Sequence, residues 1–302
     1  MSAHVIGVVG AGLMGHGIAY LLAAGGHEVG VFEPSAQVRA SLPQRLAAIV
    51  DLLGEAPALT RIQVHDTIPA AVRGVQFVFE AAPEKLPLKR QIFAELESLV
   101  PADCILASNS SAIPSTEIGR DLKHRERVVG THFWNPPHLV PLVEVVQTEW
   151  TSDATVRATI DLLAQCGRAP VHVRRDIPGF IGNRLQHALK REAIALVASG
   201  VCDAETIDTV VKCGFGARMA VLGPMEQSDL VGLDLTLDIQ NVLIADLDNS
   251  AQPTQLLKEK VASGKLGMRA GEGFRKWTPE QANEVYDRLR FYLAEQAKAA
   301  KK

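Results

Sequence analysis

The chain has 302 residues, about twice the length of a typical single domain, so two domains are expected. Hydrophobic residues at 47% and charged residues at 22% are typical of a globular protein and exclude a largely disordered chain. The net charge of -3 offers no general attraction for nucleic acid or an anionic membrane, so neither partner is expected. Four cysteines without CxxC or zinc-ligand spacing predict reduced thiols, a cytoplasmic location and no metal site.

Short apolar strands alternate with helical patterns from the start of the chain as far as Val173. A strand over residues 5–9 is followed by a glycine-rich turn, a helix over 13–24 and a second strand over 29–32. Further strands are expected at 62–65, 75–80, 105–108, 128–132, 142–146 and 170–173, with the clearest helices at 86–99 and 154–166. This alternation predicts a parallel, doubly wound sheet of the Rossmann type, covered by helices on both faces.

The pattern changes after residue 177 to long helical stretches. Helices are expected at 180–199, 204–213, 224–245, 254–262 and 279–299. We therefore predict an α/β protein with an N-terminal Rossmann-type domain over residues 1–177 and an all-α domain over residues 178–302.

A G-x-G-x-x-G motif lies between the first predicted strand and the first predicted helix. It reads Gly10-Ala11-Gly12-Leu13-Met14-Gly15. The first glycine permits a tight turn, the second lets the backbone approach a pyrophosphate, and the third allows close helix–strand packing. The amides that begin the helix then face the anion, so residues 10 and 12–15 are expected to bind a dinucleotide.

Glu33 follows this motif at the end of the second predicted strand, close to the spacing at which dinucleotide-binding motifs carry an acidic residue. A carboxylate at this place accepts hydrogen bonds from the ribose hydroxyls and repels a 2′-phosphate. The next residue is Pro34 rather than a cation. The expected cofactor is therefore NAD rather than NADP.

His132 stands at the end of one predicted strand, and Glu144 lies in the next predicted strand along the chain. A histidine–carboxylate pair suits hydride chemistry, because the imidazole accepts the hydroxyl proton while the carboxylate orients the ring and stabilises the imidazolium. His132 taken by itself is more typical of a hydrogen-bonded structural histidine.

Several further motifs, in order along nearly the whole chain, resemble those of the L-3-hydroxyacyl-CoA dehydrogenase family. They are Ser108-Asn109-Ser110-Ser111, His132-Phe133-Trp134-Asn135-Pro136, Leu142-Val143-Glu144-Val145, Pro178-Gly179-Phe180-Ile181-Gly182-Asn183-Arg184, Gly223-Pro224-Met225-Glu226 and Gly271-Glu272-Gly273-Phe274. The resemblance implies that His132 is the general base and Glu144 its partner. It also implies that Ser111 and Asn183 hold the substrate oxygen.

The same resemblance implies that Glu84 and Lys89 line the nicotinamide-ribose end of the cofactor site. His138, in the same loop as His132, is expected near the substrate rather than in catalysis. The family resemblance also implies a homodimer formed through the C-terminal helices.

The chain departs from the acyl-CoA enzymes after the second strand, where residues 35–66 offer only Arg39, Arg45 and Arg61. Residues 1–84 contain no lysine, although the phosphates of CoA require charge-assisted contacts. The motifs also resemble the branch that holds lambda-crystallin (L-gulonate 3-dehydrogenase) and carnitine dehydrogenase, which act on small free acids. Arg218, an isolated cation in an apolar segment, is a candidate anchor for a substrate carboxylate.

Three interpretations of function follow. The first is an NAD-dependent dehydrogenase that oxidises a hydroxyl group of a CoA ester or of a small free acid, including an aromatic hydroxymethyl or aldehyde acid. The second is the 3-hydroxyisobutyrate dehydrogenase class, with Lys190 as the catalytic helical lysine, although the glycine-rich run expected before that lysine is missing. The third is a non-catalytic, crystallin-like NADH-binding protein.

Overall fold

The computed structural model describes residues 3–54 and 59–299, and the chain forms two compact units. The first unit runs to Gly182 and resumes at Leu289, and the second comprises Asn183–Arg288. The helical pattern of residues 178–302 predicts one all-α domain. The end of the chain instead returns to the first unit, because the last part of α12 (Pro279–Ala299) buries Ala294 in that unit's core.

The first unit contains an eight-stranded sheet in the order β3-β2-β1-β4-β5-β6-β7-β8. The strands are β1 (Val5–Val9), β2 (Glu28–Phe32), β3 (Ile62–His65), β4 (Phe77–Glu80), β5 (Ile105–Ser108), β6 (Val128–Phe133), β7 (Leu142–Val146) and β8 (Ala169–Val173). The first six strands are parallel in the order of a doubly wound dinucleotide-binding sheet. β7 is antiparallel to β6, which differs from the expected all-parallel sheet, because β6 and β7 are joined by a loop without a crossover helix.

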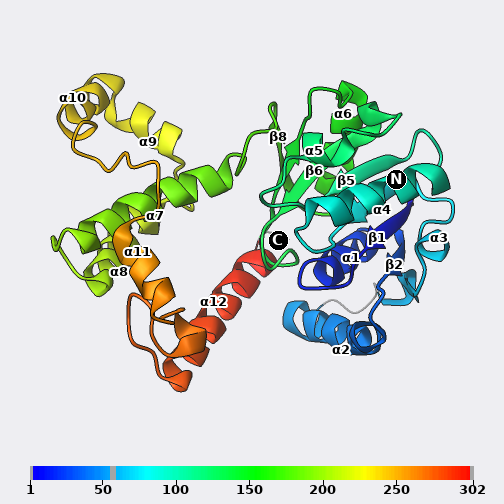
Figure 1. Ribbon diagram of the computed structural model, residues 1–302, viewed down its shortest axis with the longest axis horizontal. Helices are drawn as coiled ribbons and strands as arrows, with labels where there is room; N and C mark the ends of the chain where they lie inside the picture. Colours follow the sequence, from blue (N-terminus) through cyan, green and yellow to red (C-terminus); the bar gives the residue numbers. More distant parts are fainter. Residues whose placement is uncertain (1–2, 55–58, 300–302) are drawn as a thin grey trace. The chain divides into compact units, whose positions relative to one another are not determined.

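Helices cover both faces of this sheet, as the sequence predicted (Figure 1). The apolar side chains of α1 (Gly15–Ala24), α2 (Ala36–Leu53) and α6 (Asp153–Gln165) belong to one buried cluster. Those of α3 (Ile68–Ala71), α4 (Leu86–Leu99) and α5 (Ser115–Gly119) belong to a second cluster. The expected α/β architecture is thereby confirmed.

Helix α2 was not among the predicted helices. Pro43 lies inside it, where proline removes a helical hydrogen bond and weakens the sequence signal. The helix forms nevertheless, because Ser35 caps its first turn and Leu42, Leu46 and Ile49 bury one face against the sheet.

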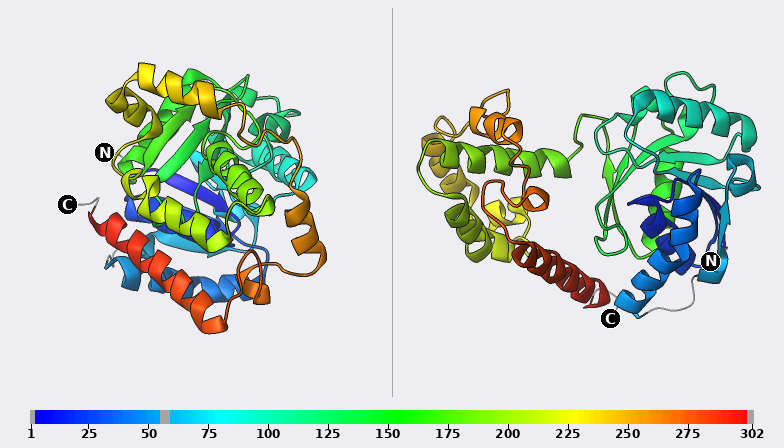
Figure 2. Two further views of the ribbon diagram at one scale, coloured as in Figure 1. Left: turned by 90° about the vertical axis from the view of Figure 1, so that its left-hand side faces the viewer. Right: turned by 60° about the horizontal axis from the view of Figure 1, so that its bottom comes forward.

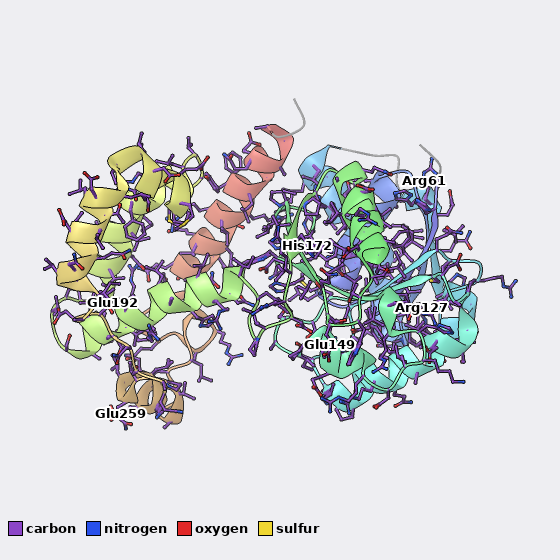
Figure 3. All side chains as sticks on the ribbon, turned by 90° about the horizontal axis from the view of Figure 1, so that it is seen from above. Arg61, Arg127, Glu149, His172, Glu192 and Glu259 are labelled. Carbon is purple, nitrogen blue, oxygen red and sulfur yellow. The ribbon has the colours of Figure 1, made fainter. Side chains whose placement is uncertain are left out.

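The second unit is helical (Figure 2). It contains α7 (Gly182–Ala198, which begins one residue before the unit), α8 (Ala204–Cys213), α9 (Pro224–Val231), α10 (Leu233–Leu243) and α11 (Gln255–Ala262). The single helix expected over residues 224–245 is two helices, because Gly232 adopts a φ of 97° and ends α9. Glu192 on α7, labelled in Figure 3, accepts a hydrogen bond from the amide of Asp248 and so holds the loop after α10. Over the described residues, no helix has the length and apolar character needed to cross a membrane.

Candidate active site

The glycine turn after β1 joins the sheet to α1 by close backbone contacts. Gly10 has a φ of 99°, a left-handed conformation that favours glycine. A Cβ atom at Gly15 would lie 1.8 Å from the carbonyl oxygen of Gly10, so no larger residue fits there. A Cβ atom at Gly12 would meet no atom within 4 Å. Space is therefore left open over the backbone of Gly12, where the motif predicts a pyrophosphate.

Glu33, at the end of β2, is buried beside this turn. Its Oε2 atom accepts a hydrogen bond from the amide of Ala11 at 2.9 Å, and its Oε1 atom accepts one from Ser35 at 3.0 Å. Leu13 is 67% exposed and Met14 half-buried, which leaves the start of α1 accessible. The open space at Gly12, the helix start and the acidic strand end fit an NAD molecule with an unphosphorylated adenosine ribose.

His132 and Glu144 lie directly opposite each other in the antiparallel β6–β7 pair. Opposite residues in such a pair project to the same face of the sheet. The Nδ1 atom of His132 lies 2.8 Å from Oε2 of Glu144, and both side chains are buried. Their separation along the chain is thus the length of a β-hairpin that brings the two groups together.

The second oxygen of Glu144 accepts hydrogen bonds from the amides of Ile181 at 2.8 Å and Gly182 at 2.9 Å. Burial raises the pKa of Glu144, but the hydrogen bonds from His132 and from these amides outweigh it and hold the pKa below the ordinary value. An ionised carboxylate accepts the Nδ1 proton, so we assign the lone pair of His132 to Nε2. That nitrogen can then accept a proton from a substrate hydroxyl.

Aromatic rings enclose the imidazole of His132. The ring centroids of Trp134 and Phe180 lie 5.7 and 5.5 Å from it. Phe180 is buried with a φ of 49°, a conformation uncommon for a residue with a side chain. A Cβ atom at Gly182 would lie 2.4 Å from the ring of Trp134, so this glycine permits the close approach of the chain.

Glu84 organises the loop after β5 that carries Ser111. Its Oε1 atom accepts hydrogen bonds from the amides of Ser111, Ala112 and Ile113 at 2.9–3.1 Å and from the hydroxyl of Ser110. Burial raises the pKa of Glu84, but these hydrogen bonds lower it further than burial raises it, so the carboxylate stays charged. The structure therefore places Glu84 under the backbone of Ser111, an exposed residue.

Lys89 is buried, and its ammonium lies 2.7 and 2.9 Å from the two carboxylate oxygens of Glu80. Its distance to Glu84 Oε2 is 3.5 Å. The hydroxyl of Ser108 also donates to Glu80 at 2.7 Å. Lys89 was a predicted site residue and Glu80 was not, because the sequence shows Glu80 only as an acidic residue at the end of the apolar strand β4. The pair fixes the end of β4 to α4 beneath the surface on which the cofactor is expected.

The remaining candidates lie elsewhere. Asn183, Lys190 and Arg218 belong to the second unit, where Asn183 is half-buried and the two cations are exposed. His138 lies in the loop after β6, within the first unit. Within residues 3–54 and 59–299, no three histidine, cysteine or acidic side chains gather into a group that could hold a metal ion.

A doubly wound sheet with this glycine turn, an acidic end of β2 and a buried His–Glu pair at the end of β6 defines an NAD-dependent dehydrogenase. The family model for the NAD-binding domain of 3-hydroxyacyl-CoA dehydrogenase matches residues 5–177, and the model for its C-terminal domain matches residues 179–277. The chain belongs to the 3-hydroxyacyl-CoA dehydrogenase family. It is therefore an oxidoreductase that uses NAD, as the sequence predicted.

Two curated relatives and one solved structure illustrate the range of the family. The chain is 39% identical to a 5-formyl-3-hydroxy-2-methylpyridine 4-carboxylate 5-dehydrogenase from Mesorhizobium japonicum, with 93% of each chain covered. It is 38% identical to an L-carnitine dehydrogenase from Streptomyces griseus, over 75% of this chain and 69% of that one. A solved 5-formyl-3-hydroxy-2-methylpyridine 4-carboxylic acid 5-dehydrogenase, titled an NAD+-dependent dismutase, is 34% identical with a TM-score of 0.92 and 99% of each chain covered.

Proposed function

We propose that this protein oxidises a hydroxyl group of a small free carboxylic acid, with NAD as the hydride acceptor, rather than a hydroxyacyl group carried on CoA. The hydroxyl is that of an alcohol or of a hydrated aldehyde. The observation that carries this proposal is that Arg39, Arg45 and Arg61, the three arginines of residues 35–66, are all bonded to the protein's own main chain.

All three guanidinium groups donate to the protein's own main chain. Arg39 donates to two carbonyl oxygens at the end of β2, at 2.7 and 2.9 Å. Arg45 donates to two carbonyl oxygens of the glycine turn, at 2.8 and 2.9 Å. Arg61, labelled in Figure 3, donates to the carbonyl of Gly26 at 3.0 Å and pairs with Glu28. These cations hold the fold together, and the chain up to Glu84 contains no lysine to replace them as phosphate ligands.

The names of two relatives support the same substrate class. The Mesorhizobium japonicum protein is named for a pyridine carboxylate, and the Streptomyces griseus protein is named for carnitine. Both compounds are free carboxylic acids, which need a site for one or a few charges rather than for the phosphates of CoA.

His132 and Glu144 of the first unit would accept the hydroxyl proton and stabilise the positive charge that this proton brings. When bound, NAD+ supplies the carbon that accepts a hydride. His132 Nε2 would accept the hydroxyl proton, while Glu144, ionised and 2.8 Å from Nδ1, stabilises the resulting imidazolium. We propose Ser111 and Asn183 as the groups that hold the substrate oxygen and Arg218 as one candidate contact for the substrate carboxylate.

A substrate panel tests the proposal. The purified protein is assayed with NAD by NADH absorbance, using carnitine, gulonate and aromatic hydroxymethyl or aldehyde acids beside 3-hydroxybutyryl-CoA. We expect the best free acid to exceed the CoA ester in kcat/KM by about a hundredfold, the effect of one or two charge-assisted contacts. A CoA ester that is the better substrate would refute the proposal.

We also propose a homodimer formed through the second unit, in a reducing cytoplasmic compartment. In the described part of α7–α11 no residue is buried, and apolar side chains such as Met225, Leu230 and Val242 are more than 70% exposed. Apolar exposure on this scale is typical of a surface that a partner covers. Sedimentation equilibrium should give twice the mass of one chain, and the mass of a single chain at micromolar concentration would contradict the proposal.

A further inference from the structure

A hollow of about 380 Å³ lies in the first unit, between the start of α1, α2, the loop after β6 and the last part of α12. Its polar lining consists of His16, Arg45, Asn135, His138 and Arg290, and the other lining residues are apolar. No acidic side chain lines it, although the lining includes two arginines and two histidines. The catalytic residues described above do not line it either.

One ring nitrogen of His16 contacts both Arg45 and the glycine turn. The guanidinium Nη2 atom lies 2.7 Å from Nδ1 of His16, and that Nδ1 lies 2.9 Å from the carbonyl oxygen of Gly12. A guanidinium can only donate and a carbonyl oxygen can only accept, so these two contacts favour opposite protonation states of Nδ1. Burial lowers the pKa of His16, the contact with Gly12 opposes this, and the charge of Arg45 adds to the lowering.

His138 also lines this hollow. Its Nδ1 atom is buried and has no hydrogen-bond partner within the part of the chain that the structure describes. This Nδ1 atom packs against Gly17 of α1, where an added Cβ atom would lie 2.7 Å from Pro137 and 3.0 Å from the nitrogen. Burial, followed by the charges of His16, Arg290 and Arg168, lowers the pKa of His138 to about 4.

Arg290 completes the cationic lining from α12. Its side chain is exposed, and over the described residues it has no ion pair or hydrogen bond to an acidic group. Arg45, by contrast, is held by the glycine turn. The hollow therefore combines one fixed and one available guanidinium with the imidazoles of His16 and His138, and no acidic side chain in its lining balances their charge.

We propose that this hollow is an oxyanion subsite that binds the carboxylate of the substrate, with Arg290 as the contact, His138 beside it and Arg45 fixed behind them. This proposal rests on the proposed function, which supplies a free carboxylate. A phosphate group carries the same chemistry, so a CoA phosphate is the other source. An anion in the hollow stabilises the protonated imidazole, so binding is expected to be coupled to proton uptake by His138.

The first test follows the histidines directly. NMR titration of the NADH-bound protein with and without benzoate reports the pKa of His138 and His16, independently of turnover. We expect benzoate to raise the pKa of His138 by at least about one unit, the effect of one neighbouring opposite charge. The same titration is repeated with coenzyme A and with inorganic phosphate in place of benzoate, to test whether the hollow binds a phosphate group instead.

Variants then locate the contact. Arg290→Gln should weaken benzoate binding about tenfold or more, the loss of one charge-assisted contact, and leave the Kd of NADH unchanged. The matched control is Arg288→Gln, an exposed arginine on the same helix that does not line the hollow. His138→Phe should abolish the proton uptake that accompanies benzoate binding.

The outcomes separate this inference from the proposed function. If benzoate leaves both histidines unperturbed while free acids are still turned over, the subsite is refuted and the function stands. If coenzyme A perturbs His138 and benzoate does not, the anion is a phosphate and the carboxylate assignment fails. If Arg218→Gln weakens benzoate binding and Arg290→Gln does not, or if Arg290→Gln raises the Kd of NADH instead, the substrate carboxylate is held elsewhere.

Discussion

The backbone amide of Ile181 donates a hydrogen bond to Oε1 of Glu144 at 2.8 Å. The other oxygen of this carboxylate contacts the imidazole of His132, also at 2.8 Å. One buried charge therefore holds the proposed base and the chain segment that leads into α7. Glu144 consequently has a structural contribution as well as a proposed chemical one, and the two can be measured separately.

The structural contribution of Glu144 predicts a pH dependence of stability. Its pKa is lowered in the folded protein, so its stabilising contribution is present above the ordinary glutamate value of 4.5 and is lost as the pH falls through the lower folded value. Between about pH 7 and pH 4, Glu144→Gln should therefore lose less of its free energy of unfolding than the wild type does. Urea unfolding at both pH values measures this, with Glu149→Gln, an exposed glutamate, as control. Equal losses in wild type and Glu144→Gln would contradict it.

The chemical role is tested at His132. His132→Gln removes the nitrogen that accepts the hydroxyl proton, so kcat should fall by about two to four orders of magnitude. The Kd of NADH should not change, because the glycine turn and Glu33 are separate from this side chain in the sheet. His172→Gln is the matched control, since His172 is exposed on β8 and bonded to Gln147. Activity retained in the His132 variant would place the base elsewhere.

The parts of the site that sequence predicted are those set by local pattern. The glycine turn and Glu33 follow from a motif at fixed spacing, and His132 and Glu144 are separated by one hairpin. The role of Glu80 was not predicted, because it depends on a buried ion pair with Lys89. The burial of Lys89 is a property of the folded structure that residue spacing does not show. The hydrogen bonds of Arg45 could not be predicted from the sequence either, because their acceptors lie far away along the chain, in the turn after β1.

The same limit applies to the helices. Pro43 obscured α2, whose stability comes from packing on the sheet rather than from local propensity. Gly232 divides the predicted helix over residues 224–245, because its positive φ interrupts the helical backbone. Apolar periodicity does not show this conformation, so the sequence predicted one helix. The return of α12 to the first unit depends on a contact between the two ends of the chain's sequence, which no local pattern encodes.

The buried Glu80–Lys89 pair predicts a large stability effect. Lys89→Met leaves the carboxylate of Glu80 buried with hydrogen bonds from Ala82 and Ser108 but without a cation. Breaking such a pair costs about 3–5 kcal/mol, and the double variant Glu80→Gln/Lys89→Met should recover part of it. Urea unfolding measures both, and Lys85→Met, an exposed lysine at the start of α4, is the control. A double variant no more stable than Lys89→Met would argue against an uncompensated charge.

The cysteines differ in expected reactivity. Burial raises the pKa of Cys104 to about 12 and that of Cys166 to about 11, so both remain protonated and inaccessible in the native protein. Cys213 is exposed and Cys202 half-buried. Ellman's reagent should therefore modify Cys213 first, and should reach Cys104 and Cys166 only after denaturation. Rapid modification of either buried thiol in the native protein, identified by peptide mass spectrometry, would contradict this order.

Two glycines of the cofactor turn should respond differently to the same substitution. At Gly12 a methyl group meets no protein atom within 4 Å, so Gly12→Ala should fold with wild-type stability and lose affinity only for NADH, whose pyrophosphate needs that space. At Gly15 the added Cβ would lie 1.8 Å from a backbone oxygen, so Gly15→Ala should destabilise the fold itself by about 1–3 kcal/mol. Thermal unfolding without cofactor and NADH fluorescence titration separate the two effects. If Gly12→Ala bound NADH as the wild type does, the open space over the turn would not be the pyrophosphate site.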